Sequence, residues 1–280
     1  MPDTPALTAT SAWDHLIESG FYEREIDPRF LAGVIPDIRE GLLRMTEGPD
    51  TDAFREVELL YDEMGWSHNS GLVRRSDDEQ KWFFHHYGPP THLHLQVSGA
   101  PVHRYERFFL ALTKVNARAK RLAYDLAREL DRRHTCPGGP LSPRIEKNHC
   151  VTRVLRYLKR DEAKAPDATV HLDRNCITVH WYSSHPGLRI FGPDGQAHTA
   201  RETAMDRIVF FTGKKFAAAT RGEFGLGTPH GVKDDARHAR TNDDRLALVS
   251  FVHCGLHEHD AAWLKGAKGS MDALEMSCVM

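Results

Sequence analysis

The sequence predicts an α+β fold in which a mainly helical N-terminal half packs on an all-β C-terminal half. Apolar residues recur in steps of three and four from Phe108 to Leu130, the spacing of one face of a helix. After about Asn148, short runs rich in Val, Ile, Thr, Phe and Tyr alternate with Gly, Pro, Asp and Asn, as in an antiparallel barrel or sandwich. No strand–helix–strand alternation follows, which argues against a doubly wound nucleotide-binding fold.

The composition is that of an ordinary globular protein, with 280 residues, 40% of them hydrophobic and 27% charged. A net charge of −2 argues against a protein that binds nucleic acid by neutralising phosphates. No run of about 18 apolar residues predicts a membrane span, and the N-terminus has no basic start or apolar stretch typical of a secretion signal. Five scattered cysteines form no C-x-x-C pair, which favours reduced thiols and a cytoplasmic location.

Residues 1–147 are expected to be mainly helical. The segment Thr51–Met64 opens with a Thr/Asp cap candidate, carries apolar residues at helical spacing and stops at a glycine. The most regular helix is expected around Phe108–Leu130, and the many Arg and Lys residues of Arg104–Arg133 then form its solvated face. Cys136 begins the sequence Cys-Pro-Gly-Gly-Pro, which breaks the chain.

Residues 148–256 are expected to form the β core, and residues 257–280 a C-terminal tail with a helix, all within one structural unit. The strand-like runs are VTRVLRYL, ATVHL, CITVHWY, GLRIF, RIVFFTG, KKFAAAT and RLALVSFVHC. Gly225 and Gly227 lie just before His230 and are interpreted as a turn that leads this histidine onto its strand.

His171 and Asp173 are the first candidates for chemistry. They are two residues apart, so in an extended segment both side chains point to the same face. A second histidine from a distant strand would complete a set of two His and one carboxylate. Such a set leaves three adjacent positions of iron(II) open for a chelating cosubstrate and dioxygen. In a chain with 18 His, about one His-x-Asp is expected by chance, so the motif needs its context.

The context resembles the core of the iron(II)/2-oxoglutarate-dependent dioxygenase superfamily, in its isopenicillin-N-synthase-like branch. The shared motifs extend from about Asn148 to His253. In chain order they are an Arg-rich strand ending in Tyr (Arg153–Tyr157), His171-x-Asp173, Ile177-Thr178, Gly187-Leu188-Arg189-Ile190, Gly213, Arg221-Gly222, Thr-Pro-His230-x-Val and Arg245-Leu246-Ala247.

The resemblance implies a double-stranded β-helix, or jelly roll, with Fe(II) held by His171, Asp173 and His230. It also implies 2-oxoglutarate as cosubstrate, with its far carboxylate bound by Arg245 and the hydroxyl of Tyr157. A planar guanidinium suits a carboxylate. The implied activity is that of an oxygenase that uses O2 to hydroxylate an aliphatic C–H of a small molecule, with release of succinate and CO2. An amino acid, a peptide-derived compound or a specialised metabolite is the expected substrate.

Two departures from the family pattern stand out. Ala247 replaces the serine that the family places two residues after the arginine, and the interval from His230 to Arg245 is longer than usual. Three alternatives therefore stay open: an iron oxidase, cyclase or desaturase without 2-oxoglutarate, a metal hydrolase on the same barrel, and an inactive barrel that only binds its ligand.

Other polar and aromatic clusters have less specific interpretations. The histidines and acids of His253–Asp260 are interpreted as a strand end and a helix cap rather than a zinc site. The aromatic run Trp82–Tyr87, near His92 and His94, is expected to seal a helix against a sheet, although it could line the mouth of the barrel.

Three residues that follow the first two ligands are further candidates for the pocket, and their direction depends on strand register: His180, Trp181 and Arg189.

Overall fold

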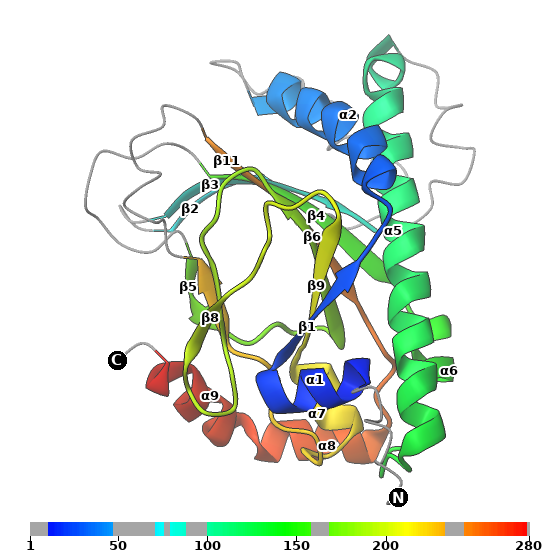
Figure 1. Ribbon diagram of the computed structural model, residues 1–280, viewed down its shortest axis with the longest axis vertical. Helices are drawn as coiled ribbons and strands as arrows, with labels where there is room; N and C mark the ends of the chain where they lie inside the picture. Colours follow the sequence, from blue (N-terminus) through cyan, green and yellow to red (C-terminus); the bar gives the residue numbers. More distant parts are fainter. Residues whose placement is uncertain are drawn as a thin grey trace, which may run out of the picture.

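Two antiparallel sheets form the centre of the structure, and helices pack around them (Figure 1). A cavity is lined by residues of both sheets. The computed structural model describes residues 11–46, 71–75, 79–87, 100–157, 168–232 and 244–278.

The larger sheet has seven strands in the order β1-β9-β6-β11-β4-β3-β2, and all neighbours are antiparallel. Its strands are β1 (Phe21–Glu25), β2 (Gly71–Arg75), β3 (Glu79–His86), β4 (Cys150–Tyr157), β6 (Ile177–Ser183), β9 (Arg207–Thr212) and β11 (Arg245–Val252).

The smaller sheet has four strands in the order β5-β10-β7-β8. Its strands are β5 (Ala168–His171), β7 (Leu188–Phe191), β8 (Ala197–Thr199) and β10 (His230–Val232). From β4 to β11 the chain crosses repeatedly between the two sheets, with β4, β6, β9 and β11 in the larger one. This alternation is the topology of a jelly roll, so the expected α+β jelly-roll core is confirmed.

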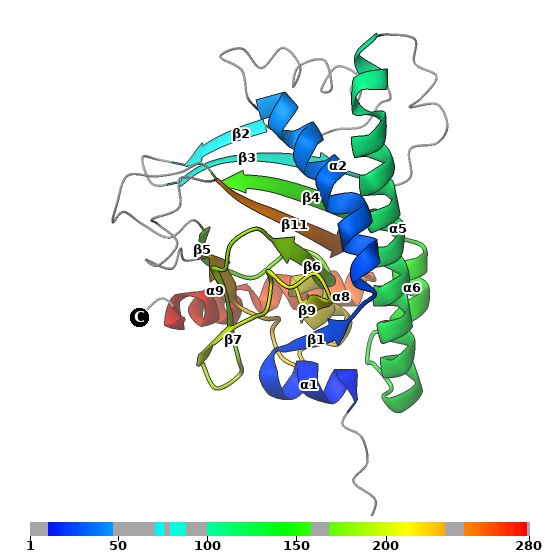
Figure 2. The same ribbon diagram turned by 45° about the horizontal axis from the view of Figure 1, so that its top comes forward.

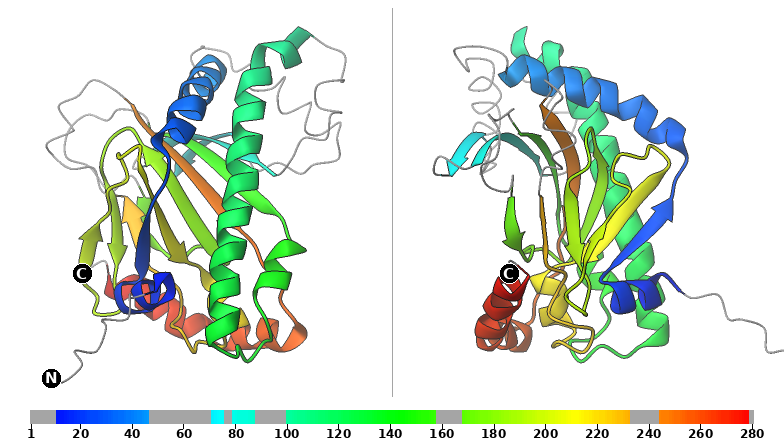
Figure 3. Two further views of the ribbon diagram at one scale, coloured as in Figure 1. Left: turned by 45° about the vertical axis from the view of Figure 1, so that its right-hand side comes forward. Right: turned by 60° about the vertical axis from the view of Figure 1, so that its left-hand side comes forward.

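The helices lie outside the sheets. They are α1 (Ala12–Ser19), α2 (Pro28–Thr46), α5 (Ala100–Arg133), α6 (Ser142–Glu146), α7 (Lys214–Ala219), α8 (Glu258–Gly266) and α9 (Lys268–Ser277). The longest, α5, runs along the larger sheet and contacts β4 and β11 (Figures 2 and 3). α2 packs against α5 and also contacts β4.

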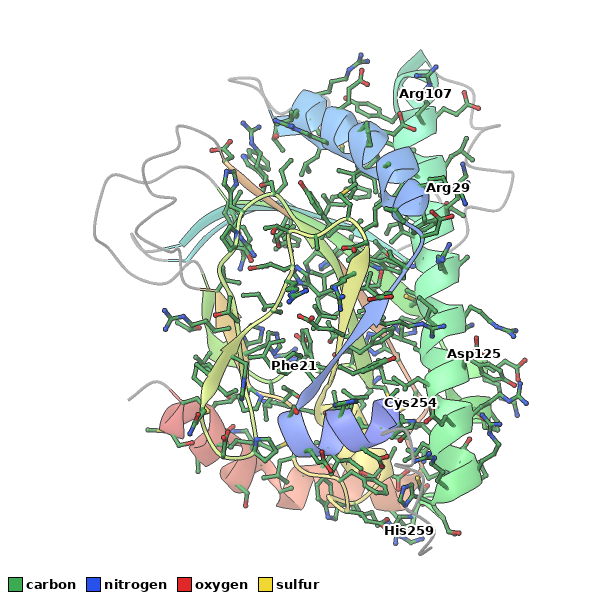
Figure 4. All side chains as sticks on the ribbon, viewed as in Figure 1. Phe21, Arg29, Arg107, Asp125, Cys254 and His259 are labelled. Carbon is green, nitrogen blue, oxygen red and sulfur yellow. The ribbon has the colours of Figure 1, made fainter. Side chains whose placement is uncertain are left out.

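The apolar stripe of α5 faces the sheet, as the sequence predicts. Phe108, Leu112 and Leu130 are among its fully buried residues. Exposed residues recur every seven positions on the opposite face, at Arg107, Lys114, Arg121 and Arg128. Figure 4 shows Asp125 on the side of α5 that points away from the sheet. The basic residues of this helix therefore form a solvated face.

Alternate residues of β4 and β11 point to opposite faces of the larger sheet. Val154 and Leu248 pack in the large core with α5, whereas Leu155 and Ala247 belong to a separate cluster on the cavity side. One face of the larger sheet thus packs in the hydrophobic core, and the other lines the cavity.

The N-terminal half is less helical than expected, because β1, β2 and β3 join the larger sheet from it. β3 contains most of the aromatic run Trp82–Tyr87, and its Phe84 packs with α5 in the large core, as expected for a run that seals a helix against a sheet. The expected helix Thr51–Met64 lies outside the described residues, as do His92 and His94.

The run KKFAAAT is a helix, α7, and not a strand. Gly213 is its N-cap residue, and three consecutive alanines, the best helix formers, follow Phe216. All three alanines are buried, so this short helix is held by packing as well as by propensity.

The C-terminal tail forms α8 and α9, which lie along one end of the sheets (Figure 1). His257 caps α8, and its backbone N–H donates to Asp260 at 3.1 Å. This arrangement confirms the cap interpretation for the end of the His253–Asp260 cluster. None of the described helices is both long enough and apolar enough to cross a membrane.

Candidate metal centre and its pocket

His171 and His230 form a directly opposed pair on two neighbouring strands. His171 is the last residue of β5 and His230 the first of β10, and the antiparallel register places them opposite each other. Their ring centroids are 4.5 Å apart. Strand pairing alone therefore brings together two imidazoles that are far apart in the sequence.

Asp173 completes this cluster from the loop after β5. Its Oδ1 lies 3.6 Å from His171 Nε2, and its Oδ2 lies 3.5 Å from His230 Nε2. One potential ligand atom from each residue lies within 4.8 Å of the other two. Among the described residues this is the one group of three or more His, Cys, Asp or Glu side chains with such spacing.

The two imidazoles are oriented by backbone carbonyls. Nδ1 of His171 lies 2.8 Å from the carbonyl oxygen of Thr169, and Nδ1 of His230 lies 3.1 Å from that of Thr228. Because a carbonyl only accepts hydrogen bonds, each Nδ1 carries the proton. The lone pair of each ring is then on Nε2, which faces Asp173.

The loop that carries Asp173 is fixed by the N-terminus of α7. The backbone N–H groups of Lys214 and Lys215 donate to the carbonyls of Asp173 and Asn175 at 2.7 and 3.0 Å. A Cβ on Gly213 would lie 2.8 Å from the Asp173 carbonyl oxygen. Only glycine therefore allows this close approach. Thr178 Oγ1 donates to Asp173 Oδ2 at 2.6 Å and holds the carboxylate itself.

Charges within the cluster favour the anionic carboxylate. Burial would raise the pKa of Asp173, but His230, His171 and the Thr178 hydroxyl together hold it well below its usual range. Burial lowers the pKa of His230 to about 4, against the opposing effect of Asp173. Burial also acts to lower the pKa of His171, but Asp173 and the Thr169 carbonyl outweigh it and the pKa is raised. A carboxylate beside a neutral imidazole is a donor set ready for a divalent cation.

Arg245 is buried in the wall of the same cavity, at the first position of β11. Its Nη2 donates to Glu202 Oε2 at 2.6 Å and to Ser183 Oγ at 2.9 Å, and its Nε donates to the His185 carbonyl at 3.1 Å. Nη1 is buried and has no hydrogen-bond partner among the described residues. The Tyr157 ring lies 5.2 Å from the guanidinium carbon. One pair of N–H donors is therefore left for a ligand.

Glu202 is a buried acid that the sequence interpretation missed. Besides Arg245, its carboxylate accepts from the backbone N–H groups of Gly187 and Leu188, and it lies 3.4 Å from His180 Nε2. Burial would raise the pKa of Glu202, but Arg245, His180 and the Leu188 N–H together lower it to about 2. A single glutamate in the polar stretch before β9 belongs to no motif, so no sequence signal marked it.

Ser183 supplies a hydroxyl close to where Ala247 lacks one. The register of β6 and β11 places Ser183 directly opposite Ala247. Its Oγ accepts from Arg245 Nη2 and lies 3.0 Å from His180 Nε2. The hydroxyl missing from β11 thus has a counterpart on the neighbouring strand.

The remaining sequence candidates divide between the cavity and the core. His180 and Tyr157 line the cavity, and Arg156 points to the other face, where it binds Asp244 at 2.6 Å. Trp181 is fully buried and donates to Ser250 Oγ at 2.9 Å. Arg189 is exposed.

The aromatic residues of β3 likewise point either to the hydrophobic core or to the cavity face of the sheet. Phe84 packs edge-on against Phe108 of α5, as the core interpretation predicts. Phe83 and His85 lie on the cavity face, beside Leu155 and Arg153 respectively.

The cavity between the sheets has a volume of about 550 Å³ and contains the three clustered side chains in its lining. Apolar residues from both sheets also line it: Val151, Leu155, Leu188, Phe211, Val232, Ala247, Val249 and Phe251. A volume of this size suits a small molecule.

Comparison with known proteins extends the description of the fold. No protein-family model matches the sequence, and no curated protein matches it. Among solved structures, a candidate oxygenase from Shewanella oneidensis is similar with a TM-score of 0.63 and 19% identity, over 95% of this chain and 97% of that chain. A dioxygenase for auxin oxidation from Arabidopsis thaliana, solved with 2-oxoglutarate, has a TM-score of 0.62 and 14% identity, over 88% and 87%. A candidate 2OG-Fe(II) oxygenase family protein from Caulobacter crescentus has a TM-score of 0.60 and 16% identity, over 89% and 84%.

Identities of 14–19% are a likeness of fold. The similarity covers nearly the whole chain and therefore includes both sheets and the helices beside them. This chain therefore shares the fold of these solved oxygenase structures.

Proposed function

We propose that this protein is an Fe(II)- and 2-oxoglutarate-dependent oxygenase that hydroxylates an aliphatic C–H bond of a small molecule and releases succinate and CO2. The observation that carries the proposal is the pairing of two sites in one cavity. A cluster of two histidines and one carboxylate lies in its lining, beside the smaller sheet. A buried arginine of the larger sheet, with one nitrogen that has no hydrogen-bond partner among the described residues, lies in the lining as well.

The metal site consists of His171 Nε2, a carboxylate oxygen of Asp173 and His230 Nε2. These donors suit iron(II), and as a set of three they leave positions free for a bidentate cosubstrate and for O2. Iron(II) bound here would activate dioxygen while 2-oxoglutarate is oxidatively decarboxylated. The protein holds the two imidazoles through Thr169 and Thr228 and the carboxylate through Thr178.

The cosubstrate site is centred on Arg245. Its Nη1 donates to the far carboxylate of 2-oxoglutarate, and Tyr157, on the directly paired position of β4, adds its hydroxyl. Glu202 and Ser183 accept from Nη2 and fix the guanidinium in the lining of the cavity.

The apolar residues of the cavity exclude water from the reacting carbon. Leu155 and Val249 from the larger sheet and Leu188 and Val232 from the smaller one lie in its lining. Exclusion of water protects a reactive oxidant from side reactions. An amino acid, a peptide-derived compound or a specialised metabolite is the substrate class we propose, and the five free cysteines favour a reducing, cytoplasmic setting.

The proposal is tested by anaerobic titration of iron(II) and then 2-oxoglutarate into the apo-protein. A weak visible charge-transfer band is expected when the keto acid chelates iron, and it is expected to be lost in His171→Ala. Bound iron without a band would favour the oxidase that works without 2-oxoglutarate. Failure to bind iron(II) at all would contradict the proposed metal site.

A further inference from the structure

Glu275 of the C-terminal helix α9 lies in the lining of the cavity, beside the segment that carries two of the proposed metal ligands. α9 contacts β5, whose last residue is His171 (Figure 1). Among the described residues that line the cavity, the carboxylates are Asp173 and Glu275. Asp173 belongs to the cluster of three potential ligands, and Glu275 does not. A second carboxylate therefore lies next to the proposed metal site without being part of its ligand set.

The carboxylate of Glu275 holds the backbone between the two ligands His171 and Asp173. Its Oε1 accepts a hydrogen bond from the backbone N–H of Leu172 at 2.7 Å. Leu172 lies just beyond the end of β5 and is buried. A buried backbone N–H needs a hydrogen-bond partner, and a carboxylate is a stronger acceptor than a neutral group. Glu275 thus supplies from a distant helix the partner that the strand does not.

The side chain of Leu172 is held by the same helix. Leu172 and Met271 of α9 belong to one buried cluster with Ala217 of α7, and Leu274 of α9 packs against this cluster. α9 therefore contacts the residue between the two ligands through both its backbone and its side chain.

Glu275 also contacts the residue that holds the backbone of Asp173 from the other side. Lys214 Nζ lies 2.9 Å from Glu275 Oε1, and the backbone N–H of Lys214 donates to the Asp173 carbonyl at 2.7 Å. Leu172 directly precedes Asp173, so the four residues form a closed chain of contacts. The side chains of Lys214 and Glu275 are only 25% and 22% exposed, so salt screens this ion pair less than one at the surface.

We propose that Glu275 is a positioning residue of the metal centre, which fixes the segment His171–Asp173 so that metal affinity depends on the C-terminal helix. This inference rests on the metal site of the function proposed above and adds to it a residue outside the ligand set. Loss of a group that orients metal ligands typically lowers metal affinity by about 10- to 100-fold.

The test compares two substitutions of the same length as glutamate. Zinc(II) affinity of the full chain is measured by competition with a chromogenic chelator. Glu275→Met has no oxygen for the Leu172 N–H and is expected to weaken zinc(II) at least about tenfold. Glu275→Gln keeps an amide oxygen and is expected to weaken it only about threefold, because a neutral acceptor keeps about half the strength of a charged one.

Asp272→Leu is the matched control on the same helix. Asp272 is paired with Lys268 at 2.6 Å, and its side chain is 45% exposed, so its replacement should leave zinc(II) affinity unaltered. Circular dichroism checks that each variant is folded. If Glu275→Met does not fold, Glu275→Asp takes its place. Its carboxylate is one CH2 too short to keep the contact with Leu172, so it should weaken zinc(II) more than Glu275→Gln does.

The inference is overturned if Glu275→Met or Glu275→Asp binds zinc(II) as tightly as the wild type, if Glu275→Gln loses as much affinity as Glu275→Met, or if Asp272→Leu loses as much. The wild type separates this failure from that of the proposed function. Tight zinc(II) binding that is indifferent to residue 275 rejects the positioning role alone, whereas a wild-type chain that binds neither zinc(II) nor iron(II) rejects the metal site itself.

Discussion

Glu202 Oε2 lies 2.6 Å from Arg245 Nη2, so the arginine proposed to bind the cosubstrate is already paired with an acid of its own chain. Both side chains are buried, and Glu202 accepts two further backbone hydrogen bonds from the start of β7. Within the part of the chain that the structure describes, Nη1 is left without a hydrogen-bond partner. The pair also ties Arg245 to the start of β7 in the smaller sheet, whose strands β5 and β10 carry His171 and His230.

Removal of this acid should destabilise the protein in a pH-dependent way. Glu202→Gln is expected to lower the free energy of unfolding at pH 7 by about 3–5 kcal/mol, because it leaves Arg245 as a buried charge without its partner. The folded pKa of Glu202 is about 2, below its ordinary 4.5. Its stabilisation is therefore complete above about pH 4.5 and is lost as the pH falls through about 2. Urea denaturation at pH 7 and pH 3 measures the difference.

The loss in Glu202→Gln should thus be smaller at pH 3 than at pH 7, and equal losses would contradict the buried pair. Glu25→Gln is a suitable control, since Glu25 is exposed and binds Arg207 at the surface. An exposed ion pair contributes about 1 kcal/mol or less.

Loss of Arg245 should weaken 2-oxoglutarate without releasing the metal. In Arg245→Met, made together with Glu202→Gln to avoid a buried unpaired acid, the Kd for 2-oxoglutarate is expected to rise more than about tenfold. Iron(II) affinity should stay near that of the wild type, because the three proposed ligands lie on β5, β10 and the loop after β5 and not on β11. Titration of the visible band gives both constants. An unchanged Kd for 2-oxoglutarate would remove Arg245 from the cosubstrate site.

The role of the Ser183 hydroxyl can be tested by removing it and then adding a hydroxyl at the paired position of β11. Ser183→Ala removes one acceptor from Arg245 Nη2 and is expected to weaken 2-oxoglutarate about two- to tenfold, the equivalent of one hydrogen bond. Adding Ala247→Ser, on the directly paired position of β11, should restore most of the affinity. If the second serine changes nothing, the two positions do not share a role.

The grouping of His171, Asp173 and His230 in one cavity with Arg245 could be predicted because these residues belong to motifs that resemble those of a known family. Ser183 could not, and the direction of the candidate His180 could not be fixed, since the two are three positions apart and strict alternation would point them to opposite faces. A bulge shifts the register so that Val249 faces His180 while Ala247 faces Ser183, and the two side chains meet at 3.0 Å. A bulge depends on tertiary packing and leaves no mark in a single sequence.

The helix α5 could be predicted from the sequence because its apolar residues keep helical spacing over many turns. β1 is short and half exposed, with the sequence Phe-Tyr-Glu-Arg-Glu, so neither length nor alternation identified it. β1 is stabilised as a strand by its antiparallel pairing with β9, a contact that the local sequence does not reveal.

Gly213 can be tested through metal affinity. Gly213→Ala would place a methyl group 2.8 Å from the Asp173 carbonyl oxygen and should displace the loop that carries this ligand. We expect zinc(II) affinity, measured by competition with a chromogenic chelator, to fall at least about tenfold, in line with other disruptions of groups that orient metal ligands.

Gly33→Ala is the matched control. Gly33 lies inside α2 with nothing within 4 Å of the added Cβ, so the change should stabilise the helix by about 1 kcal/mol and leave metal affinity unaltered. Equal metal affinity in both variants would show that the contact at Gly213 does not position Asp173.

The opposed histidines of β5 and β10 also have a consequence for folding. They join two segments 59 positions apart (171 to 230), and a slip of one residue in β5 would turn His171 to the other side of the sheet. A divalent cation binds tightly only when both imidazoles face it, so it adds its binding free energy to a single alignment of the two strands. Metal supply during synthesis would then govern how much of the newly made chain reaches the correct strand pairing, well before any substrate is encountered.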